Sequence, residues 1–567
     1  MPKLFHLHIE NFRGIQKLDH TFKEGITCII GRGDSGKTTI LDAISYALTP
    51  MQTLNFHDGD FYNCDVSKPI VIEATVIGLY DDILRRFDTH MRAVKGENII
   101  TSMLDPETHG DCVEAVTIQL KVEKDLEPQW LALGADGTEP KPVRASEREL
   151  FNCFYISEYN DRHFSLAKGT PLSTLFRQKA EKKTEVLNAE LIAELGRTAK
   201  SGFENAIQSE GVFKEVFAAI SKNATTLGLS TGEVKASLDQ REFLLRENKI
   251  ALHKDNIPFR QLGKGSKRLL SLAIQLSLTD PSGIILIDEI EQGLEPDRVQ
   301  QAVAHLLTQH GIQIIITTHS QHVVQELECK NIFIKTPQNW SLKQIDTELQ
   351  GLVRKHPMAL FAKSIIVAEG HTEFGVIRGI NKSRQISGKR SLAYHGVVTI
   401  DGNGNECTKT AERLVNLGYR VCLFCDSDVE TVNNQKETLK HLGVTIYDCE
   451  DGLALETQIF KDCHWSTVKK LIEYRISCDQ TSKGVFENIK SKLREPLAFS
   501  EDWYLNPTQD LREAIGKASG NPKNPWFKSL QMGFEVSSII MEDLSLLESN
   551  TRLLSNISNL SEWIELA

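Results

Sequence analysis

Acidic side chains follow directly on an apolar run near the middle of the second half of the sequence. The run VCLF, at residues 421–424, leads through Cys425 into Asp426 and Asp428, two carboxylates one residue apart. Like charges at this separation repel each other, and burying them without a partner is costly. A hard divalent cation held by oxygen ligands would make the pair favourable. The spacing therefore predicts a metal site at the end of a buried strand.

Two other apolar runs end in acidic residues in the same way. SIIVA leads into Glu369, with Glu373 four residues on in EGHTE, and VVTI leads into Asp401. Because the carboxyl ends of neighbouring parallel strands meet at one edge of a sheet, we expect these acids and the Asp426–Asp428 pair to face one crevice. Mg²⁺ or Mn²⁺ would be the matching ion. The alternative is an acidic surface on a Rossmann-like domain that holds no metal.

A phosphate-binding pattern lies near the N-terminus. GRGDSGKT, at residues 31–38, follows the apolar run GITCIIG and precedes the helical segment KTTILDAISYAL. This context indicates a loop whose backbone N–H groups and helix N-terminus surround the phosphates of a nucleotide. Lys37 would reach the β- and γ-phosphates, and Thr38 would bind Mg²⁺. The expected nucleotide-binding residues here are Gly31, Gly33, Asp34, Ser35, Gly36, Lys37, Thr38 and Thr39.

Two further strand ends complete the expected ATP site. GIILIDE brings Asp288, a Mg²⁺ ligand through water, and Glu289, which would orient or deprotonate the attacking water. TTHS places His319 at a strand end near the γ-phosphate. Alone, such a histidine is usually structural, and its neighbourhood with the other two motifs favours a role in the site.

The length, charge and cysteines of the chain limit its class. At 567 residues it is too long for one core, so two to four domains are expected. A net charge of −11 restricts any nucleic-acid site to a local basic patch. The eleven cysteines are scattered, which favours reduced thiols, and Cys422 and Cys425 should point to opposite faces of one strand rather than form a zinc pair. With no membrane-length apolar run and no signal-peptide pattern, we expect a cytoplasmic protein that binds no membrane.

The order of the predicted elements indicates an α/β protein with two sheets. Strand-like runs and one helix fill residues 1–85, and a polar, turn-rich region follows, in which GADGTEPKP indicates a loop or hairpin tip. Residues 176–255 are rich in Glu, Lys, Ala and Leu and predict helices. Strands return at residues 283–288 and 311–320, and a third set, with helices between its strands, predicts a second parallel sheet.

The first half of this order resembles the ABC-type ATPase heads of the SMC/RecF kind. LHIENFRGI resembles their first strand, GKGSKR a divergent signature motif, GLEP the D-loop and TTHS the switch histidine. The resemblance implies that Gly265 and Ser266 contact the ATP held by another head, and hence a homo-oligomer, a dimer or tetramer of heads. The signature differs from the usual LSGGQ and no Q-loop glutamine is assigned, which predicts slow ATP turnover.

The second half resembles the Toprim metal site of topoisomerases, primases and some nucleases, on the pattern EGxxE followed by DxD. A chain that combines an ABC-type head with a following Toprim domain resembles the OLD (overcoming lysogenization defect) family of nucleases, found in antiphage systems such as Gabija and some retrons. This implies an ABC-type ATPase at residues 1–175 and 256–355, a helical dimerisation insert at 176–255, and a Rossmann-like Toprim domain with a parallel sheet and a C-terminal helical extension at 356–567.

The family resemblance adds further candidate residues. Glu456, in the acidic helix after the DxD pattern, would complete the metal site. Lys528 or Lys523 would stabilise charge on the scissile phosphate, and Lys528 is preferred because Trp526 and Phe527 precede it and could anchor it. The resemblance thus implies metal ligands at Glu369, Glu373, Asp401, Asp426, Asp428 and Glu456 for hydrolysis of DNA by two metals.

DNA is the expected substrate, and the stretch RGINKSRQISGKR is a candidate to hold it. Its basic residues, with no acid between them, are Arg378, Lys382, Arg384, Lys389 and Arg390. A solvated helix end or loop is the equal alternative. The function expected is an ATP-regulated, metal-dependent DNA endonuclease of antiphage defence, with a helicase, or a reverse transcriptase and its nucleic acid, as possible partner. The alternative is an ATP-gated structural or repair head whose Toprim-like domain is a platform without catalysis.

Overall fold

The computed structural model describes most of the chain outside the predicted helical insert. The described residues are 2–50, 54–101, 112–157, 252–254, 256–277, 283–336, 341–479, 482–494, 507–521 and 525–566, with isolated residues and short stretches between 164 and 218. They form two compact units, one of residues 1–29, 36–318 and 337–341, the other of 30–35, 319–336 and 342–567. The boundary passes through the glycine-rich loop. The predicted insert at 176–255 lies almost wholly outside the described residues.

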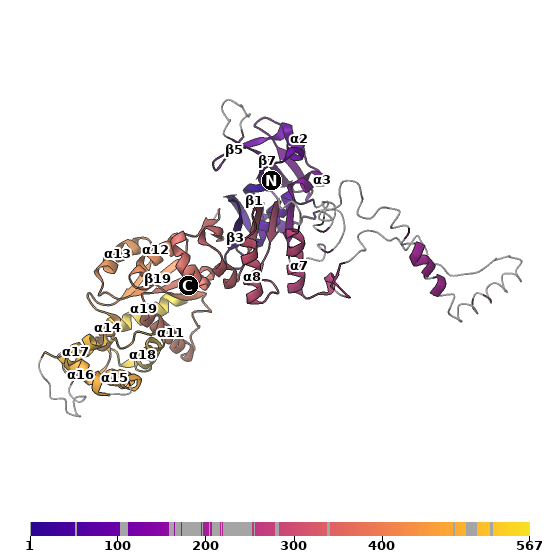
Figure 1. The fold of residues 1–567 in the computed structure, drawn as a ribbon. Coiled ribbons are helices and arrows are strands. Elements are labelled where there is room, and N and C mark those ends of the chain that lie inside the picture. The colour runs from indigo at the N-terminus through magenta and orange to yellow at the C-terminus, as the bar shows by residue number, and fades with distance from the viewer. Residues whose placement is uncertain are drawn as a thin grey trace, which may run out of the picture. The chain divides into compact units, whose positions relative to one another are not determined.

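An antiparallel sheet of eight strands forms one layer of the first unit (Figure 1). Six of its strands follow in the order β2-β1-β4-β7-β5-β6, and β8 pairs with β7 and β9. Their bounds are β1 Lys3–Phe12, β2 Ile15–Thr21, β4 Ile70–Ile77, β5 Arg92–Lys95, β6 Asn98–Ile100, β7 Val113–Val122, β8 Pro128–Leu133 and β9 Lys141–Pro142.

The sequence reading of residues 86–175 was partly wrong. GADGTEPKP is a hairpin tip as predicted, because Leu131 and Ala132 of β8 pair with Pro142 and Lys141 of β9. The polar region around it nevertheless contains β7, a ten-residue strand in the middle of the sheet. This strand has no continuous apolar run, because apolar and polar residues alternate along it. Val116, Ile118, Leu120 and Val122 are buried, and the residues between them are polar.

Four parallel strands of the first unit carry the nucleotide motifs. Their order is β10 (Cys153–Ile156), β13 (Gly283–Ile287), β14 (Ile312–Thr317) and β3 (Ile26–Ile30). All five residues of β13 and all six of β14 are buried, as expected for a parallel sheet covered on both faces. The associated helices are α1 (Lys37–Leu48), α7 (Lys264–Leu276) and α8 (Pro296–Leu307), and the unit also contains α2 (Asp81–Phe87) and α3 (Ala145–Arg148).

The second unit is built on a four-stranded sheet in which every pair is parallel. The order is β18 (Val397–Asp401), β17 (Ser364–Ala368), β19 (Arg420–Cys425) and β20 (Thr445–Asp448). The alternation of strands and helices had predicted this arrangement. Before the sheet come α9 (Gln321–Glu326), the antiparallel pair β15 (Ile332–Ile334) and β16 (Lys343–Gln344), and α10 (Gln350–Lys355).

Helices cover both faces of this sheet. One face packs on α12 (Cys407–Asn416) and α13 (Glu430–His441), and the other on α11 (His371–Ile386) and the C-terminal helices. Cys425 lies in the first of these cores and Cys422 in the second, so the two thiols point to opposite faces as predicted. The C-terminal helices are α14 (Leu455–Asp462), α15 (Trp465–Asp479), α16 (Ser482–Lys490), α17 (Gln509–Ser519), α18 (Leu530–Glu542) and α19 (Arg552–Glu565).

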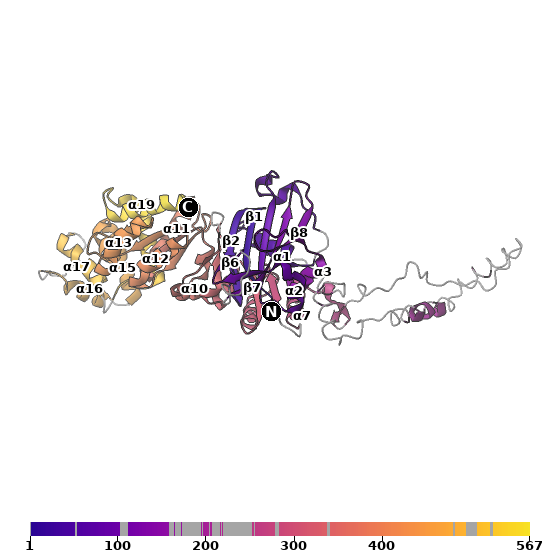
Figure 2. The ribbon, with the colours of Figure 1, turned by 90° about the horizontal axis from the view of Figure 1, so that it is seen from above.

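Close packing of helices sets the position of the C-terminal extension. A Cβ on Gly375 of α11 would lie 2.3 Å from the carbonyl oxygen of Leu530, and one on Gly533 of α18 would lie 2.4 Å from that of Thr372. Only glycine allows α11 and α18 to approach this closely. Figure 2 shows α15, α16 and α17 grouped at one end of the unit, away from α10. Within the described residues, no helix is long and apolar enough to cross a membrane.

Candidate functional site

The start of α1 has the backbone expected of a phosphate loop. Gly36 has φ 90°, a left-handed conformation that L side chains rarely adopt, and it is followed by the first helical residue, Lys37. Lys37 is buried, whereas Gly33, Asp34 and Thr38 are exposed. An exposed, glycine-rich turn at the start of a twelve-residue helix is suited to an anion.

Thr38 and Asp288 lie together, as the two motifs require. The Thr38 hydroxyl donates to Asp288 Oδ1 at 3.1 Å, and the Thr317 hydroxyl donates to the same oxygen at 2.5 Å. A hydroxyl and a carboxylate in contact are a donor set that suits Mg²⁺ bound with a nucleotide. Thr317, which the sequence analysis did not single out, therefore orients the carboxylate of Asp288.

Glu289 has an unusual backbone for its residue type. Its φ is 46°, in the left-handed region, where a residue with a Cβ is strained. Its N–H donates to the Thr317 hydroxyl at 2.8 Å, which fixes this conformation. His319, the predicted switch histidine, is exposed two residues after the end of β14.

The predicted signature turn packs on the predicted D-loop. A Cβ on Gly265, at the start of α7, would lie 2.2 Å from the carbonyl oxygen of Gly293. Three residues on, the buried Arg268 side chain donates to the backbone oxygen of Asp288 and to Gln292 Oε1 at 3.4 Å. Arg268 thus ties α7 to the strand end that bears Asp288. Arg268 was not predictable from the sequence, because one arginine in a basic helix carries no distinguishing pattern.

The second unit brings three predicted carboxylates into a buried cluster. Glu373 is 4% exposed, Asp426 7% and Glu456 0%. They come from three elements: the first turn of α11, the end of β19 and the start of α14. Burial and mutual repulsion raise the pKa values of two of these carboxyl groups. Burial, together with the neighbouring Glu456, raises the pKa of Glu373 to about 7. Burial, Glu373, Glu456 and Glu369 likewise raise the pKa of Asp426 to about 9.

These carboxylates keep free acceptor atoms. Glu373 Oε2 accepts from the Gly370 N–H at 2.9 Å, but its Oε1 has no hydrogen-bond partner. Neither oxygen of Glu456 has one, although Lys528 Nζ lies 3.3 Å from Glu456 Oε1 as an ion pair. Buried oxygens without donors are rare in folded proteins. An all-oxygen donor set of this kind suits Mg²⁺ or Mn²⁺.

Glu369 and Asp428 flank the cluster. Glu369 Oε2 accepts from the Asp426 N–H at 2.8 Å, and its pKa is raised by burial. Asp428 is exposed two residues beyond Asp426. Within the described part of the chain, no three His, Cys, Asp or Glu side chains stand in the arrangement of a ready-made metal site. The carboxylates would therefore have to close around an ion.

Asp401, on the strand next to the one that ends before Glu369, is paired with cationic side chains. Its carboxylate accepts from Lys355 Nζ at 2.6 Å and from the Asn403 N–H at 2.9 Å. Burial raises its pKa, but Lys355 and the Asn403 N–H outweigh that effect and the net pKa is lowered. Asp401 is thus compensated by a cation of its own, and its place among the predicted metal ligands stays a prediction.

Lys528 lies beside the cluster and directly follows two buried aromatic residues that anchor this part of the chain. Trp526 and Phe527 are buried and pack edge-on and stacked against Phe460. Burial lowers the pKa of Lys528, but Glu456, Glu373 and Asp426 outweigh it and the net pKa is raised. Its side chain stays about half exposed, at 51%. Lys523 lies outside the described residues.

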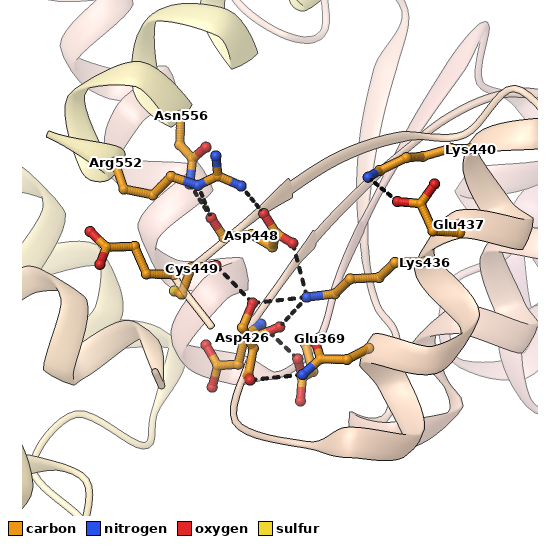
Figure 3. Close-up of polar contacts among 12 residues, drawn as sticks. Glu369, Asp426, Lys436, Glu437, Lys440, Asp448, Cys449, Arg552 and Asn556 are labelled. Carbon is orange, nitrogen blue, oxygen red and sulfur yellow. Dashed lines mark hydrogen bonds and ion pairs between the residues drawn. The ribbon is translucent and has the colours of Figure 1, made fainter. Parts of the chain in front are cut away.

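A dense set of hydrogen bonds holds the loop that carries Asp426 (Figure 3). Asp426 Oδ1 accepts from the Leu455 N–H at 2.9 Å, so the start of α14 faces this carboxylate. Lys436 of α13 donates to the Asp426 carbonyl oxygen at 3.0 Å and pairs with Asp448 at 3.0 Å. This role of Lys436 was not predictable from the sequence, because a lysine in a polar helix predicts a solvated side chain.

The predicted basic stretch divides into two parts. Arg378 and Lys382 are exposed on α11, and Lys389 and Arg390 are exposed after it. Arg384 is instead buried, at 2%, and bonds to Ser561 and Glu565 of α19. Arg384 is therefore a structural residue, which corrects the expectation that it contacts DNA.

Comparison with known proteins gives two family matches, which together span residues 6–325. Residues 6–221 match the family described as "AAA domain", and residues 220–325 match "AAA domain, putative AbiEii toxin, Type IV TA system". These matches support an ATPase of AAA type in this part of the chain. Thr38, Asp288 and Glu289 of its motifs fall within these two matches.

One curated relative and several solved structures are similar to the chain. "Retron Ec83 probable ATPase" of Escherichia coli is 24% identical over 382 residues, 58% of this chain and 70% of the relative. An Smc head domain from Pyrococcus furiosus is 12% identical, with a TM-score of 0.34, covering 62% of this chain and 98% of that one. The recombination mediator RecF with ATP is 13% identical, with a TM-score of 0.33, covering 60% and 99%.

Proposed function

We propose that the chain is an ATP-regulated, divalent-metal-dependent DNA endonuclease of the OLD type. The observation that carries the proposal is the cluster of Glu373, Asp426 and Glu456, buried together with unpartnered oxygens and with Lys528 beside them. A structural core has no use for three adjacent carboxylates, because each raises the cost of ionising the others. A role in binding cations accounts for their burial.

The residues of the second unit have distinct parts in this proposal. Glu369, Glu373, Asp426, Asp428 and Glu456 would hold the ions, with Asp401 left out on account of its pairing with Lys355. Bound divalent cations would supply an activated water and neutralise charge on the phosphodiester. Lys528, cationic and half exposed, would contact the scissile phosphate or the leaving oxygen.

Arg378 and Lys382 would contact the DNA backbone. Both lie on the helix that begins at the cluster, one turn apart, and neither has an acidic side chain within ion-pair distance among the described residues. At a rise of about 1.5 Å per residue, Arg378 lies roughly 8 Å along the axis from Glu373, and Lys382 roughly 14 Å. Charges so placed bind phosphates without reading sequence.

A role in antiphage defence follows from two similarities. The first is the relative described as a retron ATPase, and the second is the resemblance of the motifs to OLD nucleases. In such a system the ATPase heads would pair through the Gly265 turn, in a dimer or tetramer, beside a defence partner with its own nucleic acid. Mg²⁺ would serve both the ATP site and the nuclease site.

The deciding experiment removes the strand-end pair. Asp426→Ala with Asp428→Ala should abolish nicking of plasmid DNA in Mg²⁺ or Mn²⁺, by 100-fold or more, while ATP binding stays near wild type. The matched control, Glu430→Ala with Glu437→Ala, removes two exposed acids from the next helix and should nick normally.

Lys37→Ala provides the reciprocal comparison, because it should lose ATP binding. Wild-type protein that never nicks DNA in either metal would favour the alternative function, a DNA-binding head with a non-catalytic platform. A double variant that loses ATP binding as well would contradict the assignment of the two sites to separate sheets.

A further inference from the structure

Lys436 is a buried lysine on an otherwise solvated helix. It is 7% exposed, whereas its neighbours Gln435 and Glu437 are exposed. An ammonium group is seldom buried unless its three donors are satisfied. Here all three have acceptors: the Asp426 carbonyl oxygen at 3.0 Å, the Ser427 hydroxyl at 2.9 Å and Asp448 Oδ2 at 3.0 Å.

Two of these acceptors belong to the loop that bears the acidic pair. The Asp426 carbonyl oxygen and the Ser427 hydroxyl are consecutive along the chain, so Lys436 fixes the backbone between the two aspartates (Figure 3). The Asp426 N–H is held from the other side by Glu369 at 2.8 Å. The backbone of Asp426 is thus held at both its N–H and its carbonyl oxygen, and the Leu455 N–H holds its carboxylate at 2.9 Å.

The third acceptor connects Lys436 to the C-terminal helix. Asp448, at the end of β20, also pairs with Arg552, and its backbone oxygen accepts from Asn556 at 2.7 Å. Figure 3 shows Asp448 between Lys436 on one side and Arg552 and Asn556 on the other. The position of the lysine is therefore set by a rigid support and not by its own flexible stem.

We propose that Lys436 is a positioning residue that presets the Asp426–Asp428 loop for divalent-cation binding. The inference rests on the proposed nuclease function, since the cation is the one that this function requires. Without Lys436 the loop would lose two of its hydrogen bonds, and the carboxylates, repelling one another, would separate. Groups that orient metal ligands from behind typically contribute 10–100-fold in metal affinity.

The test measures cation binding separately from cleavage. Mn²⁺ is titrated calorimetrically into the full-length chain without nucleotide, and the nicking rate is followed against Mg²⁺ concentration. Lys436→Met, which keeps the stem and removes the donors, should weaken Mn²⁺ binding about 10-fold and shift the Mg²⁺ dependence by a similar factor. Lys436→Gln, with a shorter but polar side chain, should fall between Lys436→Met and wild type.

Lys440→Met is the matched control. Lys440 lies one turn further along α13 and is exposed, and its one ion pair among the described residues is with Glu437 of its own helix, at 2.6 Å. It should bind Mn²⁺ as wild type does. If Lys436→Met melts at a lower temperature yet binds Mn²⁺ with wild-type affinity, the lysine only supports the fold and the inference is wrong. The same holds if neither Lys436 variant folds.

The failure of the proposed function gives a different result. In that case wild type and the double variant Asp426→Ala with Asp428→Ala bind Mn²⁺ equally, because the acidic pair holds no ion in either protein. Weak binding in Lys436→Met beside normal binding in wild type and Lys440→Met therefore tests the lysine alone.

Discussion

The carboxylates of the second unit are expensive to bury as they stand. Glu456 is fully buried, neither of its oxygens accepts a hydrogen bond, and the only counter-charge that the described residues place against it is Lys528 at 3.3 Å. A buried ion pair seldom repays the desolvation of both charges, and one lysine cannot neutralise three acids. The cluster thus lowers the stability of the fold unless protons or cations bind to it.

Stability should consequently fall as pH rises in the absence of metal. Unfolded Glu373 would lose its proton near pH 4.3, whereas in the fold its pKa is about 7. Between these values the folded state binds the extra proton, so the free energy of unfolding decreases with increasing pH, by on the order of 3 kcal/mol for this residue. Thermal unfolding in EDTA should show this decline, and Mg²⁺ should reduce it.

Glu373→Gln serves as the reference for that measurement, because an amide of the same shape has no proton to lose. Its melting temperature should depend less on pH over the same interval, and Mg²⁺ should raise it less. Equal pH profiles for the variant and the wild type would show that Glu373 ionises in the fold as it does in the unfolded chain.

Sequence patterns located the acids better than they located the cations that act on them. Asp426 was predictable because it directly follows an apolar strand, and Glu373 because it lies in the first helical turn after the strand-end residue Glu369. Asp401 follows a strand in the same way, but Lys355, 46 residues earlier, pairs with it. The partners of Lys436 and Arg268 were not predictable for the same reason. Long cationic side chains reach partners on other elements, and no local sequence pattern indicates which residue the partner is.

Helix α11 joins the candidate catalytic site to a candidate surface for DNA. Its first turn holds Glu373, its buried face contacts α18 through Gly375, and its exposed face carries Arg378 and Lys382. The cations lie over aromatic rings, Arg378 over Phe374 at 5.7 Å and Lys382 over Phe534 at 5.2 Å. These contacts restrict both side chains and reduce the entropy that a phosphate contact would cost.

Removing these two cations should weaken DNA binding in a salt-dependent manner. Each phosphate neutralised on a duplex contributes about 0.9 to the slope of log affinity against log salt concentration. Arg378→Gln with Lys382→Gln, in a background lacking Asp426 and Asp428, should reduce that slope by about 1.8. Fluorescence anisotropy of labelled duplex DNA at several salt concentrations measures it.

Lys440→Gln with Lys461→Gln removes two positive charges elsewhere, because both lysines pair with exposed acids of their own. Its slope should equal that of the parent. If both double variants reduce the slope equally, DNA binding depends on the net charge alone, and α11 provides no surface for DNA.

At the scale of the whole molecule, the predicted ATP site and the proposed metal site stand on separate parallel sheets. The first unit supplies Thr38, Asp288 and Glu289, and the second supplies the carboxylates. The order of motifs predicted both sheets, since each motif sits at a strand end. The nucleotide and metal contacts themselves remain predictions, and the helical insert lies outside the described residues. The remaining question is how nucleotide bound in the first unit changes the free energy of the states of the second.

ATP should regulate cleavage without driving it. Hydrolysis of a phosphodiester is downhill, so the proposed metal site would need only Mg²⁺ or Mn²⁺, and no ATP, to cut DNA. Nucleotide can change only the balance between arrangements of paired heads, by as much as its affinities for those arrangements differ. Glu289→Gln should bind ATP normally, hydrolyse it at least 10-fold more slowly and hold the nuclease in its ATP-bound state, whether that state is active or restrained.

The measurement compares nicking rates of wild type and Glu289→Gln, each without nucleotide, with ATP and with ADP. Regulation predicts that Glu289→Gln with ATP keeps one steady rate, equal to the rate that wild type shows just after ATP is added. Wild type should then drift toward its ADP rate as ATP is consumed, because hydrolysis releases the paired arrangement. If instead cleavage rises in proportion to ATP hydrolysed, and Glu289→Gln cuts nothing under any nucleotide condition, hydrolysis itself powers the nuclease and regulation by state is the wrong description.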